Sequence, residues 1–425
     1  MSARTIPTIE ATIIATHSQE IWANNIKFSH NGDTLKEEAG QVAAVKASQA
    51  LWIDALCVPF RDPARRDCLQ SMGEIFSSAF QVVVVLTKHC SDLVQDIRCT
   101  GTLNQTELLA LENEDWVNRA WTYQEAVNSR SMFFIVEDDR KAMLSAQDFL
   151  RSIVDATEKY KDKHKLDNIG WVQQHPSLYN LEMLLADYMI ADFAERSAYQ
   201  VMSVMGQRVA EYPEDYFYAM IGSITTKSSD NTASGALPPS EYFIRVCEAK
   251  GDYSFIFSTA QRSRVSGQRW RPVDGNFTAV LPSLLTFGGG EVGHPEATHL
   301  QLDNMFRLIP GTISEDGLKA ASWFMDPDSK GLLPEVVATG ILQRLRSLGF
   351  TGCGDFLEFE TGFFFPQSKV VVAGNFFAVV SSDIHWVTGG PGLVLHSNGT
   401  DIDDFYDVGA FVGRSPKSGK QLNIR

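Results

Sequence analysis

The 425-residue sequence has no excess of positive charge and no long apolar run. Its formal net charge is −15, from 52 acidic residues against 37 lysines and arginines. Nonspecific binding to nucleic acid or to an anionic membrane requires a basic surface, so this balance opposes both kinds of partner. The apolar runs fall far short of the ~18 residues that cross a bilayer, so we expect no membrane span.

Cysteine pairs with the spacing of zinc ligands are also missing. The six cysteines include no CxxC pair, and we expect no metal site. The N-terminus has no charged segment followed by an apolar stretch, which is the pattern of a secretory signal. We therefore expect a cytoplasmic protein with reduced thiols, in which the glycosylation sequons at Asn104, Asn276 and Asn398 are chance matches.

Phosphate-binding glycine loops are absent as well. The glycine-rich stretches at 288–290 and 389–392 do not follow a strand and open a helix, so no bound nucleotide cofactor is expected. One local basic cluster stands against the acidic composition: Arg61, Arg65 and Arg66. We interpret it as a solvated helix end, with phosphate binding as the less favoured alternative.

What the sequence does contain is an ordinary globular composition, in which the first third alternates strands with helices. Apolar, β-branched stretches predict strands, and apolar residues at helical spacing predict helices. The predicted strands are residues 10–16, 51–58, 81–86 and 132–136, and the predicted helices are residues 35–50, 63–79, 106–112 and 116–128. Asp62 is the predicted cap of the helix that begins at Pro63. This order predicts an α/β domain with a doubly wound, flavodoxin-like parallel sheet.

Three further segments follow the α/β domain, which we place at residues 1–145. Residues 146–225 are predicted to be a helical extension, and the polar, breaker-rich residues 226–240 a linker. Residues 241–425 are predicted to form a mixed, β-rich C-terminal domain. Within it, residues 369–380 are typical of a hairpin that turns at Gly374-Asn375.

Two candidate site residues lie where the predicted strand at 51–58 ends. Ligands of doubly wound sheets bind beyond the carboxyl ends of the strands. Asp54 is either a structural carboxylate bonded to the next loop or a site carboxylate that binds a ligand hydroxyl. Cys57 is expected to be a buried structural thiol, with ligand contact or nucleophilic chemistry as the alternative.

A second candidate cluster lies in the predicted helix at 116–128. Trp121 and Glu125 are four residues apart and share one helix face. The indole can stack on a flat heteroaromatic group, and the carboxylate can bind a ribose or stabilise an oxocarbenium-like centre. In the competing interpretation, Trp121 is core and Glu125 belongs to a structural network with Arg119 or Gln124.

These segments resemble a known family. The runs Leu51–Val58, Met72–Ala79 and Val82–Leu86 are similar to the second sequence block of heterokaryon incompatibility (HET) domains. Trp116 with Arg119–Glu125 resembles the third block. A further resemblance follows the domain, at Arg208 and residues 213–222. Residues 248–252 and 270–272 are similar to stretches found downstream in some members.

The resemblance implies a fungal protein of non-self recognition and regulated cell death. HET domains are similar to TIR domains, whose enzymatic members cleave NAD at the nicotinamide–ribose bond, so the implied sheet is TIR-like. Glu125 matches the catalytic glutamate, and Trp121 and Asp54 would line the pocket with Arg119, Gln124 and Cys57. NAD would then be a substrate, with no resident cofactor, and self-association could be required for activity.

One departure from the family pattern keeps other functions open. The family's first block ends a strand with serine, glycine and aromatic residues, and the corresponding residues 13–18 lack the glycine and the aromatics. This divergence favours a non-catalytic interaction or regulatory module with a protein partner. A pocket reused in secondary metabolism is the third interpretation.

Overall fold

The structure is a computed structural model of the chain. It describes Trp52 and residues 57–137, 139–190, 196–225, 237–273, 275, 277–282, 289–325, 331–369, 375–415 and 418–425. The predicted strand at 10–16, the predicted helix at 35–50 and Asp54 lie outside the described residues.

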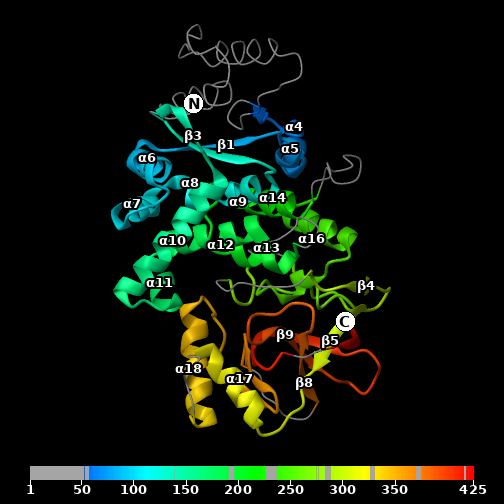
Figure 1. Cartoon of the computed structure of the whole chain (residues 1–425). Helices are drawn as coiled ribbons and strands as arrows, with labels where there is room; N and C mark the ends of the chain where they lie inside the picture. Colours follow the sequence, from blue (N-terminus) through cyan, green and yellow to red (C-terminus); the bar gives the residue numbers. More distant parts are fainter. Residues whose placement is uncertain are drawn as a thin grey trace. The chain divides into compact units, whose positions relative to one another are not determined.

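The chain divides into two compact units, and Figure 1 labels its helices and strands. Unit 1 comprises Met1–Tyr188 and Thr225–Ala236, and unit 2 comprises Met189–Ile224 and Leu237–Arg425. No helix among the described residues is long and apolar enough to cross a membrane.

Unit 1 contains, among its described residues, a three-stranded mixed sheet in the order β1-β2-β3. Strands β1 (Val82–Leu86) and β2 (Met132–Val136) pair in parallel, which confirms both predicted strands. Strand β3 (Asp139–Ser145) pairs antiparallel with β2 and was not predicted, because its charged start reads as a loop. The chain is therefore α/β, but the described sheet is mixed rather than all parallel.

Helices connect and cover this sheet. Between β1 and β2 the chain forms η1 (Lys88–Cys90), α6 (Ser91–Thr100), α7 (Gln105–Ala110), η2 (Leu111–Asn113), α8 (Asp115–Asn118) and α9 (Ala120–Asn128). After β3 come α10 (Ala146–His164), α11 (Asn168–Gln174) and α12 (Pro176–Ile190), so residues 146–190 are mainly helical. Helices α6 and α10 both contact β2 and β3.

A row of buried side chains crosses one face of the sheet of unit 1. Val84, Phe134 and Leu144 lie in register on β1, β2 and β3, and all three are buried. Phe134 stacks on Phe149 of α10, with ring centroids 3.9 Å apart. The edge of Trp116 in α8 meets Phe134 with centroids 5.5 Å apart, so α8 is fixed to this core.

The helix predicted from Pro63 to Ala79 is broken into α4 (Ala64–Gln70) and α5 (Met72–Ser78). Ser71 interrupts it, because its hydroxyl donates to the Asp67 carbonyl at 2.8 Å and competes with the helical backbone. The predicted cap is also wrong: Pro63, not Asp62, occupies the cap position, and no side chain caps the helix.

The end of the strand predicted at 51–58 needs a correction. Cys57 has helical backbone and an exposed side chain, whereas the pattern predicted a buried thiol at a strand end. A short apolar run does not distinguish a strand from a helical segment by periodicity. Residues 53–56 of this run lie outside the described residues.

Unit 2 is built on an eight-stranded antiparallel sheet in the order β11-β5-β8-β9-β10-β7-β6, with β4 paired to β5. The strands are β4 (Gly293–Pro295), β5 (Leu300–Arg307), β6 (Leu357–Phe359), β7 (Gly362–Pro366), β8 (Phe376–Ser381), β9 (Gly390–His396), β10 (Asp404–Gly413) and β11 (Lys420–Ile424). The β-rich character is therefore confirmed. Strand β8 confirms the second half of the predicted hairpin, whose turn falls partly on the undescribed residues 370–374.

The core of this sheet centres on Phe364, which is fully buried among aliphatic and aromatic side chains of five strands. Gly392 on β9 and Gly409 on β10 make room for its ring, since an added Cβ at either position would overlap it. This packing explains why glycine is placed inside two central strands.

Helices of unit 2 precede the sheet and interrupt it. They are α13 (Ala198–Met205), α14 (Pro213–Ile224), α16 (Pro239–Lys250), η4 (Ser254–Phe257), α17 (Glu315–Met325) and α18 (Pro334–Ser347). Helix α14 packs against α13 and α16. Helix α16 begins at Pro239, and residues 226–236 of the linker predicted at 226–240 lie outside the described residues.

Candidate functional site

Helix α9 has one stripe that is open to solvent. Of its nine residues, Trp121 and Glu125 are half-buried and the other seven are buried. The two lie four residues apart, so they share one helix face, as the sequence predicted. A helix that buries everything except an indole and a carboxylate presents those two groups to whatever approaches it.

The Glu125 carboxylate is held in place by an indole from the preceding helix. The Trp116 Nε1–H donates to Glu125 Oε2 at 3.2 Å. The Ser129 hydroxyl donates to the backbone carbonyl of Glu125, which closes the last turn of α9. Sequence reasoning placed Trp116 in the family block but gave it no role. The sequence signal for this role of Trp116 is its position nine residues before Glu125, on the other side of a helix break.

That break lies at Arg119. Its backbone is extended, with φ −71° and ψ 144°, so α8 ends and α9 begins in a new direction. The Thr122 hydroxyl donates to the Arg119 carbonyl at 2.7 Å and stabilises the turn. The Arg119 side chain is exposed at the start of α9.

Gln124 lies on the buried side of α9, away from the stripe that carries Trp121 and Glu125. Its side chain is fully buried, and neither its amide oxygen nor its amide nitrogen has a hydrogen-bond partner among the described residues. An amide in this state typically costs about 1–3 kcal/mol. It is therefore a ready donor and acceptor for any polar group that reaches it.

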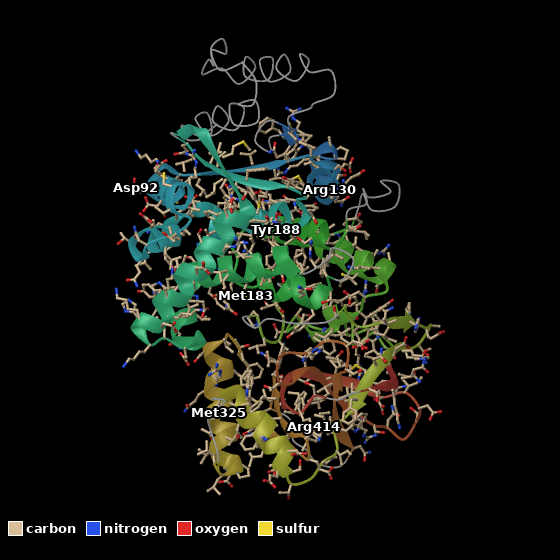
Figure 2. The ribbon with its side chains drawn as sticks, in the orientation of Figure 1. Asp92, Arg130, Met183, Tyr188, Met325 and Arg414 are labelled. Carbon is tan, nitrogen blue, oxygen red and sulfur yellow. The ribbon has the colours of Figure 1, made fainter. Side chains whose placement is uncertain are left out.

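The segment that bears the stripe is pinned to α12. The Tyr123 hydroxyl donates to Asp187 Oδ2 at 2.7 Å, and both side chains are buried. The Asn118 amide donates to the Ser177 hydroxyl at 2.9 Å and accepts from Asn180 at 3.2 Å. The Tyr123 bond holds α9 against α12, and the two Asn118 bonds hold α8 against α12. Arg130, labelled in Figure 2, is exposed just past the end of α9.

A second carboxylate near the end of β1 has a structural role. Glu114 is buried and accepts hydrogen bonds from the Thr87 N–H at 3.1 Å and the Thr87 hydroxyl at 2.8 Å. The Cys90 thiol lies 3.5 Å from the same oxygen, and burial with this neighbour raises the pKa of Cys90 to about 12. Glu114 thus fixes the turn that follows β1, and Cys90 stays a thiol.

The two sequence blocks of the N-terminal region meet through α5. The edge of Trp52, from the segment that resembles the second family block, meets Phe76 on α5 of the same block with ring centroids 5.7 Å apart. Helix α5 in turn packs against α9, which carries the segment that resembles the third block. The structure therefore connects Trp52 to the helix of Glu125, while Asp54 lies outside the described residues.

The remaining groups near this region do not form a metal centre. No cluster of three or more histidine, cysteine, aspartate or glutamate side chains suited to a metal ion occurs in the described part of the chain. At the start of α4, Arg66 lies 3.8 Å from Asp62, and Arg61 is exposed, which agrees with a solvated helix end.

Two stretches of unit 2 that the sequence singled out come together in space. Arg271 pairs with Glu241 at 2.8 Å and with Glu248 of α16. Just beyond, the buried carboxylate of Asp252 accepts from the backbone N–H groups of Ala198 and Ser254. These carboxylates and Arg271 are satisfied within the fold, so we interpret this cluster as structural.

Comparison with known proteins gives one match. Residues 9–125 match the model of a protein family described as heterokaryon incompatibility protein (HET). The match lies wholly within unit 1, begins before the first predicted strand and ends at Glu125. No curated protein and no solved structure matches the chain.

Proposed function

We propose that this chain, which carries a HET segment at residues 9–125, is an effector of heterokaryon incompatibility that kills the fungal cell from the cytosol by cleaving NAD. The Trp121–Glu125 stripe of α9 is the observation that carries the proposal. The resemblance of this block to TIR domains suggests NAD as the substrate, and a TIR-like fold of the N-terminal domain is part of the same proposal.

The chemistry follows from the half-buried indole of Trp121 and the half-buried carboxylate of Glu125. Cleavage breaks the bond between the ribose C1′ and the nicotinamide nitrogen, and nicotinamide leaves with the electron pair. The Glu125 carboxylate, fixed by the Trp116 N–H, stabilises the positive charge that develops on the ribose before water adds. The Trp121 ring offers a flat face for the nicotinamide or the adenine.

The test is release of nicotinamide from NAD by the purified full chain. Because enzymes of this kind can require assembly, the wild-type protein is assayed alone and as a forced dimer. We expect turnover by at least one of these forms and loss of turnover in Glu125→Ala. A folded wild-type protein that releases no nicotinamide in either form would refute NAD cleavage.

A second candidate is a non-catalytic interaction module, and the Trp116–Glu125 hydrogen bond favours it. In that function Glu125 joins α8 to α9, and the stripe binds a protein partner through Trp121. Toxicity of the expressed chain discriminates the two. If Glu125→Gln still kills cells while Trp121→Ala does not, the stripe is a binding surface rather than an active site.

A further inference from the structure

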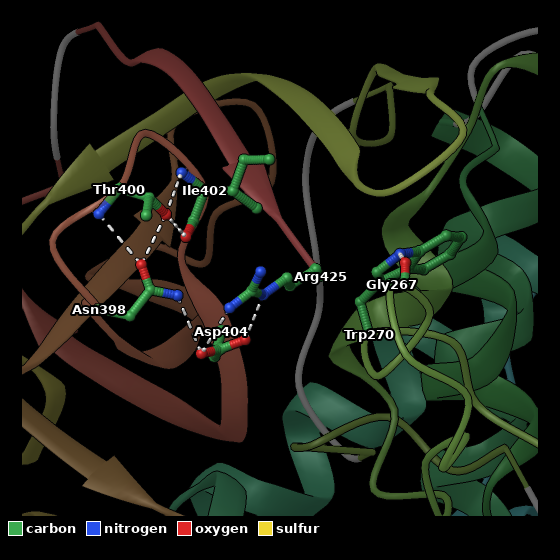
Figure 3. A network of polar contacts seen from close by, with 7 residues as sticks. All are labelled: Gly267, Trp270, Asn398, Thr400, Ile402, Asp404 and Arg425. Atoms are coloured by element: carbon green, nitrogen blue, oxygen red, sulfur yellow. Dashed lines mark hydrogen bonds and ion pairs between the residues drawn. The ribbon is translucent and has the colours of Figure 1, made fainter.

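The loop between β9 and β10 contains Asn398, which is followed by Gly399. Figure 3 shows Asn398 in a network of polar contacts with Thr400, Ile402, Asp404 and Arg425. Asparagine followed by glycine is the dipeptide in which the side-chain amide is most easily attacked by the next backbone nitrogen. The contacts around Asn398 decide whether the fold suppresses or promotes that attack.

Two donors converge on the amide oxygen of Asn398. The Thr400 backbone N–H donates to Asn398 Oδ1 at 3.1 Å, and the Thr400 hydroxyl lies 2.6 Å from the same oxygen and 2.9 Å from the Ile402 carbonyl, so its single proton is shared between these two acceptors. Donors aimed at a carbonyl oxygen stabilise the negative charge that appears there when a nucleophile adds to the carbon. The Asn398 Cγ is therefore polarised in the direction that attack requires.

The amide nitrogen is held on the opposite side. Asn398 Nδ2 donates to Asp404 Oδ2 at 3.2 Å, and Asp404 also accepts from Arg425 Nε at 2.7 Å. The bond from Arg425 lowers the pKa of Asp404, so this carboxylate stays ionised. The side chain is thus fixed at both ends, with its oxygen toward Thr400 and its nitrogen toward Asp404.

The attacking group is unhindered. Gly399 is exposed and has a φ of +81°, and a Cβ added there would meet nothing within 4 Å. Among the described residues, the Gly399 N–H donates to no hydrogen bond. Its nitrogen is therefore not committed elsewhere, and no side chain of its own shields the neighbouring Cγ.

We propose that Asn398 is a self-modifying residue, which deamidates in the folded protein through a cyclic imide with Gly399. The Gly399 nitrogen loses its proton to solvent and bonds to Asn398 Cγ, and the Nδ2 group takes up a proton and leaves as ammonia. Water then opens the five-membered ring at either carbonyl, which gives aspartate or isoaspartate at position 398. No oxidant or cofactor is needed.

The product changes how the loop is held. A carboxylate at position 398 cannot donate to Asp404, and it places a like charge beside that residue. The isoaspartate form also lengthens the backbone between Gly399 and β9. Both products loosen the loop that Asp404 and Arg425 anchor to the sheet, so modification converts one fold into a second, locally relaxed form.

The test compares the rate of Asn398 deamidation in the folded full chain with its rate in the same chain unfolded in urea. Both samples are held at mildly alkaline pH and followed by peptide mass mapping, with a chemical assay for isoaspartate. We expect the folded chain to react faster at Asn398. An equal or lower rate in the folded chain overturns the proposal.

Matched variants test the two donors. Thr400→Val removes the hydroxyl and should slow the folded-state reaction about tenfold, less than the ~100-fold that loss of one donor costs in a water-excluded enzyme site. Thr400→Ser keeps the hydroxyl and should keep the rate. Asn31–Gly32, the same dipeptide elsewhere in the chain, is the internal reference and should not respond. An unchanged rate in Thr400→Val also overturns the proposal.

Discussion

The two units of this protein use their polar groups differently. In unit 1, helix α9 has a half-buried indole and a half-buried carboxylate on one face, and its other side chains are buried. In unit 2, the buried carboxylate of Asp252 accepts hydrogen bonds from backbone N–H groups, and Arg271 forms an ion pair within the same unit. The family match covers only unit 1. Under the proposed function, we therefore expect the chemistry on NAD in unit 1, whose described sheet is mixed, and not in unit 2 with its antiparallel sheet.

Two carboxylates, Glu125 in unit 1 and Glu291 in unit 2, illustrate this difference between the units. Glu125 is half-buried and accepts an N–H from Trp116. Glu291 is fully buried, accepts from the Ser381 hydroxyl at 2.5 Å, and its second oxygen has no partner among the described residues. A carboxylate in the second environment contributes to the pH dependence of folding rather than to catalysis.

The largest expected effect on stability comes from the core of unit 2. Phe364→Ala should lower its free energy of unfolding by roughly 3–5 kcal/mol, because the ring is fully buried and two glycines are shaped around it. Hydrogen exchange measured by mass spectrometry on peptides of β7–β10 reports the change. Peptides of α9 serve as the control and should exchange as in the wild type. An equal increase of hydrogen exchange in the β7–β10 peptides and in the α9 peptides would contradict the proposed difference between the units.

The next effect is a pH dependence confined to unit 2. Burial, and then the neighbouring carboxylates Asp383 and Asp252, raise the pKa of Glu291 from 4.5 to about 8. The folded state therefore keeps a proton that the unfolded state has lost, and stability should fall as pH rises from about 4.5 through 8. Glu291→Gln should flatten this dependence in denaturant titrations. An equally steep dependence in the variant would assign it to another group.

Two matched substitutions in unit 1, Glu114→Gln and Glu125→Gln, should distinguish a carboxylate that stabilises the fold from one that acts in the site. Glu114→Gln should destabilise the turn after β1 by about 1–3 kcal/mol, because its amide NH2 adds two donors to a buried site where Thr87 and the Cys90 thiol already approach as donors. Glu125→Gln should cost less than about 1 kcal/mol, since its amide oxygen can still accept from Trp116. Hydrogen exchange in η1 and α6 measures the first effect, and exchange in α9 the second. The reverse order would make Glu125 the structural residue.

The smallest effect is expected at the edge of unit 2. The bond from Arg425 lowers the pKa of Asp404, so the stabilisation it gives is full above the unfolded pKa of about 3.9 and lost as pH falls below it. In Asp404→Asn, this loss of stability at acidic pH should be absent. Exchange of the β10 and β11 peptides between neutral and acidic pH measures it. If exchange of these peptides in the variant still rises in acid as in the wild type, the Asp404–Arg425 pair is not the cause of the pH dependence.

Much of the fold was predictable where local pattern and packing agree. The runs at Val82–Leu86 and Met132–Val136 are apolar and β-branched or aromatic, and both form the predicted strands. Strand β3 was missed because a pairing partner, not its own charged sequence, makes it extended. The helix break at Ser71 was missed because a single hydroxyl bond decides it.

The candidate site was predictable in part. Helical spacing correctly placed Trp121 and Glu125 on one face, since i and i+4 are neighbours on any helix. The partner of Glu125 could not be read from spacing, because Trp116 reaches it across the extended backbone at Arg119. The buried, unpaired amide of Gln124 was equally hidden, since burial depends on α9 packing against other elements.

The most direct measurement is nicotinamide release from NAD by Glu125→Gln beside Glu114→Gln and the wild type. The account predicts that Glu114→Gln retains wild-type turnover per folded molecule, while Glu125→Gln loses it by a factor of about 100 or more. Turnover in Glu125→Gln equal to that of the wild type would contradict the assignment of chemistry to the Trp121–Glu125 stripe.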